Sequence, residues 1–138
     1  MKHYAVIDTN VLVSAMLKWS SIPGNILEFA FSGTIIPVLR DEIVAEYHVV
    51  LMRDKFHLTE KIVDDVIQAL EEQGEYIDTV NMDYKLPDPK DAIFYAIVME
   101  KRKEDDAYLV TGNIKHFPAR TFIVTPREML DILQEGRL

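Results

Sequence analysis

The feature that most constrains this chain is an alternation of short β-rich runs with helical segments along its whole length. Branched and aromatic residues predict strands at 3–7, 35–38, 76–80, 107–110 and 122–124. Helical spacing of apolar residues and helix-capping signals predict helices at 11–17, 25–31, 41–53, between Thr59 and Gly74, at 91–103 and from Pro126 onward. Strands that alternate with helices favour a parallel sheet covered on both faces. We therefore expect a three-layer α/β/α fold with a sheet of four to five parallel strands.

The length of the chain and the scattered positions of its prolines and glycines indicate one domain over residues 1–138. Prolines and glycines are scattered, and no linker or repeat separates two parts of the chain. The longest apolar run, Ala92 to Met99, has eight residues, whereas a membrane-spanning helix needs about 20. The start of the chain has no apolar signal stretch, and there is no cysteine. We expect a cytoplasmic protein without a membrane segment.

The charge balance restricts the kinds of partner. The chain has 15 basic and 23 acidic side chains and a net charge of −8. A generic nucleic-acid coat needs a basic face, so this class is excluded. An acidic protein can still act on nucleic acid if metal ions screen its acidic site.

Several polar side chains stand where an α/β sheet places its ligands, at the carboxyl ends of the strands. Asp8 closes the first strand, Thr111 and Asn113 follow the strand at 107–110, and Asp91 opens a helix. Glu46 lies on the inward side of the helix at 41–53, or at its edge. If the three carboxylates converge, their repulsion requires a proton or a cation. Oxygen ligands without cysteine favour Mg²⁺ or Mn²⁺, and a metal-bound water is a nucleophile for a phosphodiester.

Each of these residues also has a structural interpretation. Asp8 or Asn10 could cap the helix that follows them, and Asp88 or Asp91 could cap theirs. Glu46 could form an ion pair with Arg40 or Arg53. These alternatives stay open at the level of the sequence.

Together, the motifs resemble the PIN-domain (PilT N-terminus) proteins, in particular the bacterial and archaeal branch of VapC-like toxins from toxin–antitoxin pairs. The similar segments are VIDTNVLVSA at 6–15, IVAEY at 43–47, DPKD at 88–91, YLVTGN at 108–113 and IVTPRE at 123–128. They occur in the family's order and cover essentially the whole chain.

The resemblance implies a metal-dependent ribonuclease that uses Mg²⁺ or Mn²⁺, commonly as a homodimer, with a small antitoxin protein that blocks the cleft. The catalytic residues carried over are Asp8, Glu46, Asp91 and Asn113, of which Asp8, Asp91 and Glu46 would hold the metal. The residues expected around the metal ligands or along the substrate are Asn10, Thr111, Asp88, Lys115 and His116. Glu46 or Asp88 would take the proton from the attacking water. Lys90 and Arg120 are further candidates for contact with the RNA backbone, and Trp19 could stack a base or serve as a packing residue.

One position departs from the family pattern. The fourth acidic position is often aspartate in the family, and here it is Asn113. A neutral oxygen in place of a carboxylate weakens a metal site. The main alternative is therefore a weak or inactive PIN-like module that binds another protein. A phosphatase of the haloacid-dehalogenase type is disfavoured because its second aspartate, the general acid, corresponds to Asn10. A phosphoacceptor receiver domain fits less well still, because it needs clustered acids at the first strand.

Overall fold

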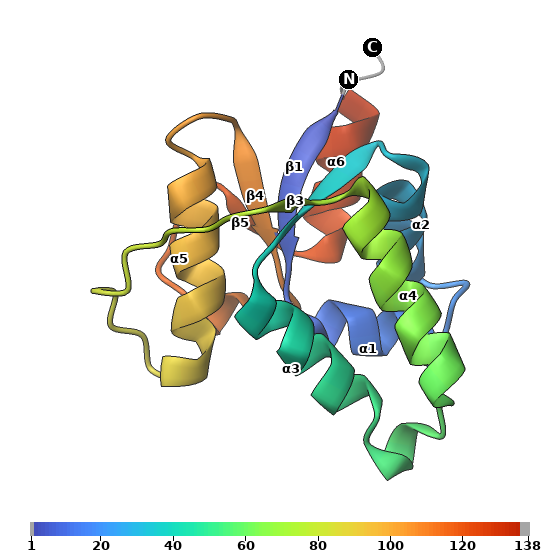
Figure 1. Cartoon of the computed structure of the whole chain (residues 1–138). Coiled ribbons are helices and arrows are strands. Elements are labelled where there is room, and N and C mark those ends of the chain that lie inside the picture. The colour runs from blue at the N-terminus through green and yellow to red at the C-terminus, as the bar shows by residue number, and fades with distance from the viewer. Residues whose placement is uncertain (1, 136–138) are drawn as a thin grey trace.

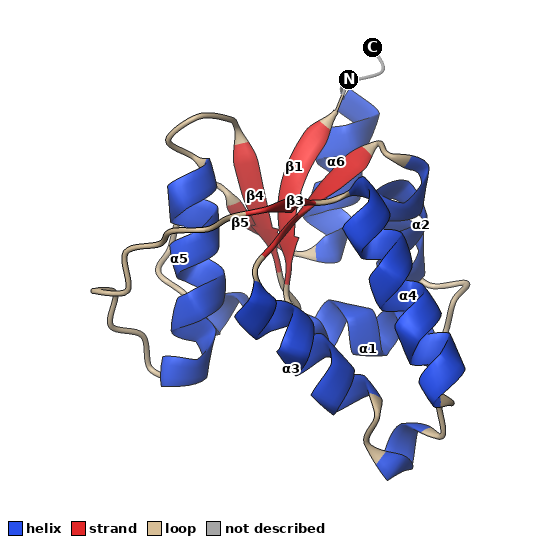
Figure 2. Ribbon diagram, in the orientation of Figure 1, coloured by secondary structure: helices blue, strands red, loops and turns tan. Residues whose placement is uncertain are grey.

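A computed structural model describes residues 2–135 and shows one sheet of five parallel strands flanked by helices (Figures 1 and 2). The strands are β1 (His3–Ile7), β2 (Ile35–Leu39), β3 (Glu75–Tyr76), β4 (Ala107–Val110) and β5 (Ile123–Val124). Their order across the sheet is β3-β2-β1-β4-β5, and every neighbouring pair is parallel. The expected fold class, a three-layer α/β/α arrangement with a parallel sheet, is confirmed.

Six α-helices cover the sheet in the described part of the chain. They are α1 (Thr9–Leu17), α2 (Ile22–Ser32), α3 (Asp41–Leu51), α4 (Glu60–Gln73), α5 (Ala92–Lys101) and α6 (Pro126–Glu135). Helix α5 packs against β1, β2 and β4, while α2 and α4 pack against β2, and α6 against β5. Figure 1 shows α5 on one side of the sheet and α2, α4 and α6 on the other, with α1 and α3 at the end where the strands finish.

The central strands and the first half of α5 form the core. Ala5, Val6 and Ile7 of β1 are buried, and so are Leu109 and Val110 of β4. Strands buried on both faces are continuous apolar runs, which is typical of parallel sheets. In α5, buried residues run without a break from Phe94 to Val98, as the apolar start of this helix predicted.

The capping signals form the predicted contacts. Thr125 Oγ1 accepts a hydrogen bond from the Glu128 amide at 3.1 Å, and Glu128 Oε1 accepts one from the Thr125 amide at 2.9 Å. This reciprocal pair is a capping box, and it opens α6. Gly33 ends α2 with a left-handed φ of 87°, a conformation that glycine adopts without steric cost.

The prediction of a strand at 76–80 is wrong in its length and position. Strand β3 spans two residues, Glu75–Tyr76, and residues 77–80 are not in a strand. The Ile77 amide still donates to Leu39 O at 2.8 Å, but Arg40 Nη1 donates to the carbonyl oxygens of Ile77 and Asp78. Arg40 therefore takes the acceptors that a longer strand would have needed.

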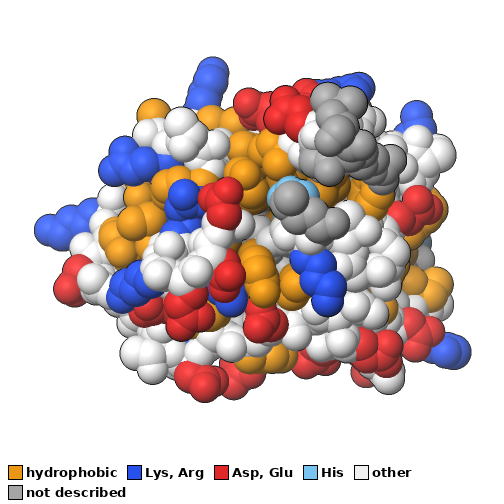
Figure 3. Space-filling view, turned by 90° about the horizontal axis from the view of Figure 1, so that it is seen from above, with side chains coloured by type: hydrophobic (Ala, Val, Ile, Leu, Met, Phe, Trp, Pro, Cys, Tyr) orange, Lys and Arg blue, Asp and Glu red, His pale blue; other side chains and the backbone are white. Residues whose placement is uncertain are grey.

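Charge is mixed at the end of the sheet where the strands begin. Seen from above, basic and acidic side chains are interspersed around hydrophobic ones, with no single basic surface (Figure 3). In residues 2–135 no helix is long and apolar enough to cross a membrane.

Candidate active site

Asp8 is the most buried carboxylate of the candidate site. It follows the last residue of β1, and its residue surface is 7 % exposed. Thr111 Oγ1 donates to Asp8 Oδ2 at 2.8 Å, and Asn10 Nδ2 donates to the same oxygen at 3.4 Å. Asp8 stands at the N-cap position of α1, but its side chain makes no capping hydrogen bond. The carboxylate is thus directed to β4 rather than to the helix that follows it.

The electrostatics of Asp8 show that acidic groups converge at this point. Burial first, and then the negative charges of Asp91 and Glu46, raise the pKa of Asp8 to about 6, against the lowering effect of the Thr111 hydrogen bond. A carboxylate whose charge is disfavoured by burial and by two neighbouring acids is typical of a functional site.

Glu46 is on α3 and reaches the start of α1. Thr9 Oγ1 donates a short hydrogen bond to Glu46 Oε2. The ion pair considered with Arg40 is not what the structure shows, because Arg40 Nε binds Glu42 Oε2 at 2.8 Å. The Thr9 contact holds Glu46 on the side of Asp8.

Tyr47, the next residue of α3, makes a second link to β1. Its side chain is 1 % exposed, and its hydroxyl donates to Ile7 O at 2.5 Å. Burial first, and then the charges of Asp8 and Glu46, raise the pKa of Tyr47 well above its usual value, so the phenol stays a donor. The sequence does not single out Thr9 or Tyr47 as site contacts. The available signal is their position in the chain, because Thr9 follows Asp8 and Tyr47 follows Glu46.

Asp91 lies at the end of a 3₁₀ turn, Pro89–Asp91, and its side chain is 16 % exposed. Burial raises its pKa, followed by the charge of Asp88, while His116 opposes the shift and Glu46 adds to it. The buried atom Asp91 Oδ2 has no hydrogen-bond partner among residues 2–135. His116 Nδ1 lies 3.5 Å from that oxygen, an ion-pair contact only when the imidazole is protonated.

The two aspartates of the DPKD segment differ in role: one caps the turn, and the other is free to take part in the candidate site. Asp88 Oδ1 accepts from the Lys90 amide at 3.0 Å, so Asp88 is the cap of the turn, and its side chain is exposed. Asp91 makes no capping hydrogen bond at the start of α5. Asp91 is therefore the one that faces the other carboxylates.

The loop after β4 makes hydrogen bonds with Asn10 and Thr111. Gly112 N donates to Asn10 Oδ1 at 3.1 Å, and the Asn113 amide donates to Thr111 Oγ1 at 3.0 Å. Thr111 is fully buried, whereas Asn113 is exposed. Asn10 and Thr111 thus connect this loop to Asp8, while the contact found for Asn113 comes from its backbone.

The cationic candidates lie at the surface. Lys90, Lys115, His116 and Arg120 are all exposed. Trp19 is a packing residue: its ring stacks on Phe31 at 5.8 Å, and its Nε1 donates to Glu28 at 2.7 Å.

The donor set suits a hard cation that keeps part of its water. The charges of Asp91 and Glu46 act on Asp8, and the buried oxygen Asp91 Oδ2 lacks a hydrogen-bond donor among the described residues. Within residues 2–135, however, no three acidic or histidine side chains are already placed to ligate one ion directly. Mg²⁺ and Mn²⁺ bound partly through water fit this arrangement, because Mg²⁺ usually retains several waters.

Comparison with known proteins identifies the family of this chain. A family model described as the PIN domain matches residues 4–115. Comparisons with curated proteins and with solved structures each gave no match. The matched range contains Asp8, Glu46, Asp91 and Asn113, and it stops before β5 and α6. Since this range is most of the chain, the protein belongs to the PIN-domain family.

Proposed function

We propose that this protein is an endoribonuclease that uses Mg²⁺ or Mn²⁺ to hydrolyse phosphodiester bonds. PIN domains are generally nucleases, and nucleases of this family generally use divalent metals. The observation that carries the proposal is the burial of Asp8 beside Asp91 and Glu46, which raises the pKa of Asp8 to about 6. A cation at this point would relieve the repulsion among the three carboxylates.

The side chains have distinct tasks in the proposed reaction. Asp8, Asp91 and Glu46 would hold the metal, directly or through its waters, and the bound ion would supply an activated water and screen the phosphate charge. Thr111 and Asn10 orient Asp8 through the hydrogen bonds at its Oδ2. Glu46 or Asp88 accepts the proton of the attacking water.

The substrate chain would cross the surface beside the carboxylates. The exposed side chains Lys115 and His116 follow the loop that contacts Asp8, and in this proposal they bind the phosphates of the RNA. We propose RNA rather than DNA on the resemblance to the toxin branch. The same resemblance supports a toxin role in the cytoplasm, a homodimer and an antitoxin protein as partner.

A second function has one specific observation in its favour. Asn113 supplies an amide where the family often has a carboxylate, and its side chain is exposed. A PIN domain that binds metal weakly, or not at all, could serve as a protein-interaction module. Metal-dependent cleavage separates the two functions.

The test is incubation of the purified protein with total cellular RNA in Mn²⁺, with EDTA and the variant Asp8→Asn as controls. We expect cuts that need Mn²⁺ and vanish in the variant. Asp131→Asn, a matched change at an exposed position of α6, should cleave normally. A single-stranded DNA of the same length tests the choice of RNA. Folded wild-type protein that leaves RNA intact in Mn²⁺ would favour the interaction module.

A further inference from the structure

We propose that a groove beside Asp91 binds a base of single-stranded RNA next to the cleaved phosphate. The inference rests on the proposed function and adds a substrate-binding site to it. The groove has a volume of about 470 Å³ and is lined by Met82, Tyr84, Lys85, Leu86, Pro89 and Ala92. Its volume lies in the range of small-molecule sites.

The groove is lined in part by the chain neighbours of Asp91. Pro89 begins the short turn that ends at Asp91, and Ala92 is the first residue of α5. One wall of the groove is therefore the segment that brings Asp91 to Asp8 and Glu46. Figure 1 shows the chain between β3 and α5 passing over α5 before it turns back to the start of that helix. A nucleic-acid strand bound at the carboxylates would meet this groove at the adjacent nucleotide.

The lining offers an aromatic ring and a hydrophobic contact. Tyr84 and the buried Tyr95 pack in a T-shaped arrangement with their ring centroids 5.0 Å apart, so the ring of Tyr84 is held before any ligand arrives. Met82 is 49 % exposed and so adds apolar surface that a ligand can cover. Bases of single-stranded RNA stack on aromatic side chains, and this contact tolerates different base identities.

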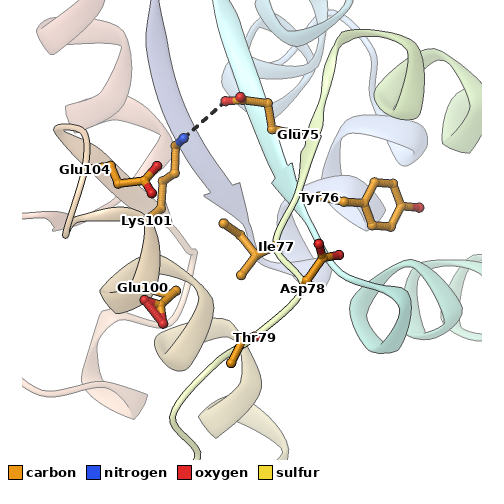
Figure 4. Close-up of a pocket in the computed structure, with 8 residues that line it drawn as sticks. All are labelled: Glu75, Tyr76, Ile77, Asp78, Thr79, Glu100, Lys101 and Glu104. Atoms are coloured by element: carbon orange, nitrogen blue, oxygen red, sulfur yellow. Dashed lines mark ion pairs between the residues drawn. The ribbon is translucent and has the colours of Figure 1, made fainter.

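Charge favours a nucleic acid over a basic or neutral ligand at this groove. Lys85 is the one charged side chain among its six lining residues. The other three grooves described in the structure have more acidic than basic lining residues. Figure 4 shows one of them, where Glu75, Asp78, Glu100 and Glu104 line the groove together with Lys101. In a protein with a net charge of −8, the groove beside Asp91 is thus the one of these four that attracts a phosphate backbone.

The experiment measures binding without cleavage. Asp8→Asn protein in EDTA is titrated into a fluorescently labelled oligouridylate, since this variant is catalytically silent and carries one repulsive charge less. Adding Tyr84→Ala should weaken binding about 5- to 100-fold, the usual effect of losing one base–aromatic stack. Adding Lys85→Ala should make the plot of log affinity against log salt less steep, by the amount expected for the loss of one phosphate contact.

Two further variants make the result specific. Tyr76→Ala removes an exposed tyrosine from the acidic groove of Figure 4 and should leave RNA binding unchanged. Met82→Glu places a negative charge at a half-exposed position, so it should weaken binding even if Tyr84→Ala disturbs the packing on Tyr95.

The outcomes separate the groove from the proposed function. If the Tyr84→Ala and Met82→Glu proteins bind RNA as tightly as their parent, the groove is a protein-binding surface or has no ligand, and the base-binding proposal is wrong. Absence of any RNA binding by the folded Asp8→Asn protein contradicts it equally. Neither result affects Mn²⁺-dependent cleavage by the wild type, which decides the proposed function by itself.

Discussion

At the scale of single residues, Asp8 is ionised at neutral pH in a place that disfavours its charge. Burial and two acidic neighbours raise its pKa to about 6, while Thr111 and Asn10 hold its orientation by hydrogen bonds. The fold is therefore less stable with an ionised Asp8 than with a neutral one. This cost at a functional position is expected if the site is built for a cation.

Asp8→Asn should accordingly stabilise the metal-free protein at neutral pH. Because the pKa of Asp8 is higher in the folded than in the unfolded chain, the penalty is absent below the ordinary value of 3.8, grows as the pH rises to about 6, and is complete above it. The gain above pH 6 should be about 1–3 kcal/mol. Urea unfolding in EDTA across this pH range measures it. An equal effect for Asp131→Asn, or a gain that disappears with rising pH, would contradict the assignment.

Tyr47→Phe should destabilise the fold and slow cleavage. The change leaves the buried Ile7 carbonyl without the donor that now lies 2.5 Å away, at a cost of about 1–2 kcal/mol. Because this bond holds α3 against the end of β1, we expect kcat to fall while KM for RNA changes little. Tyr95→Phe, a matched change at another buried tyrosine, should leave kcat near that of the wild type. A normal kcat in a destabilised Tyr47→Phe protein would make Tyr47 a packing residue alone.

The sequence singled out the acidic candidates but not the contacts around them. Asp8 and Asp91 stand out because they lie at a strand end and a helix start, and in the structure burial, and in addition the charge of Glu46, raises the pKa of both. The hydrogen bonds from Thr9 to Glu46 and from Tyr47 to the Ile7 carbonyl depend on how α1, α3 and β1 pack together, which local patterns do not contain. Which aspartate of the DPKD segment is the cap also depends on tertiary contacts.

At the scale of elements, helices with strong end signals were predictable and the edge strand was not. Thr59 caps α4 and Thr125 caps α6, as their sequences indicated. Strand β3 has two residues and sits at the edge of the sheet, where pairing on one side gives little local preference. Its end is set by Arg40, 35 or more positions away in the chain.

Thr125→Ala should cost about 1 kcal/mol of stability, because it removes the hydroxyl that accepts the Glu128 amide at the start of α6. Chemical unfolding measures this loss. Cleavage should be unaffected, since α6 lies outside the range matched by the PIN domain and packs on α2 and β5. A large loss of activity in the stable variant would mean that α6 contributes to the site.

At the scale of the whole molecule, the parallel sheet explains why the site forms where it does. β1 and β4 are adjacent and parallel, so Asp8 and the loop after β4 emerge at the same end of the sheet. Helix α5 brings Asp91 to this end because its N-terminus faces it, as Figure 1 shows. The net charge of −8 is consistent with a nucleic-acid enzyme only if cations are present at this end.

The expected homodimer can be tested at this scale. The exposed large apolar side chains Leu17, Trp19, Val49 and Ile62 provide candidate contact surface. Sedimentation equilibrium should give about twice the chain mass of 15.9 kDa at micromolar concentrations. A mass equal to that of the single chain would contradict the prediction.

Calorimetric titration with Mn²⁺ is the sharpest test of whether Asp8, Asp91 and Glu46 form one divalent-cation centre. We expect saturable binding to the wild type near pH 7.5, at least about a tenfold loss of affinity in Asp8→Asn and Asp91→Asn, and unchanged affinity in Asp131→Asn. If the wild type binds no Mn²⁺, or if Asp8→Asn protein binds it equally well, these carboxylates do not form such a centre.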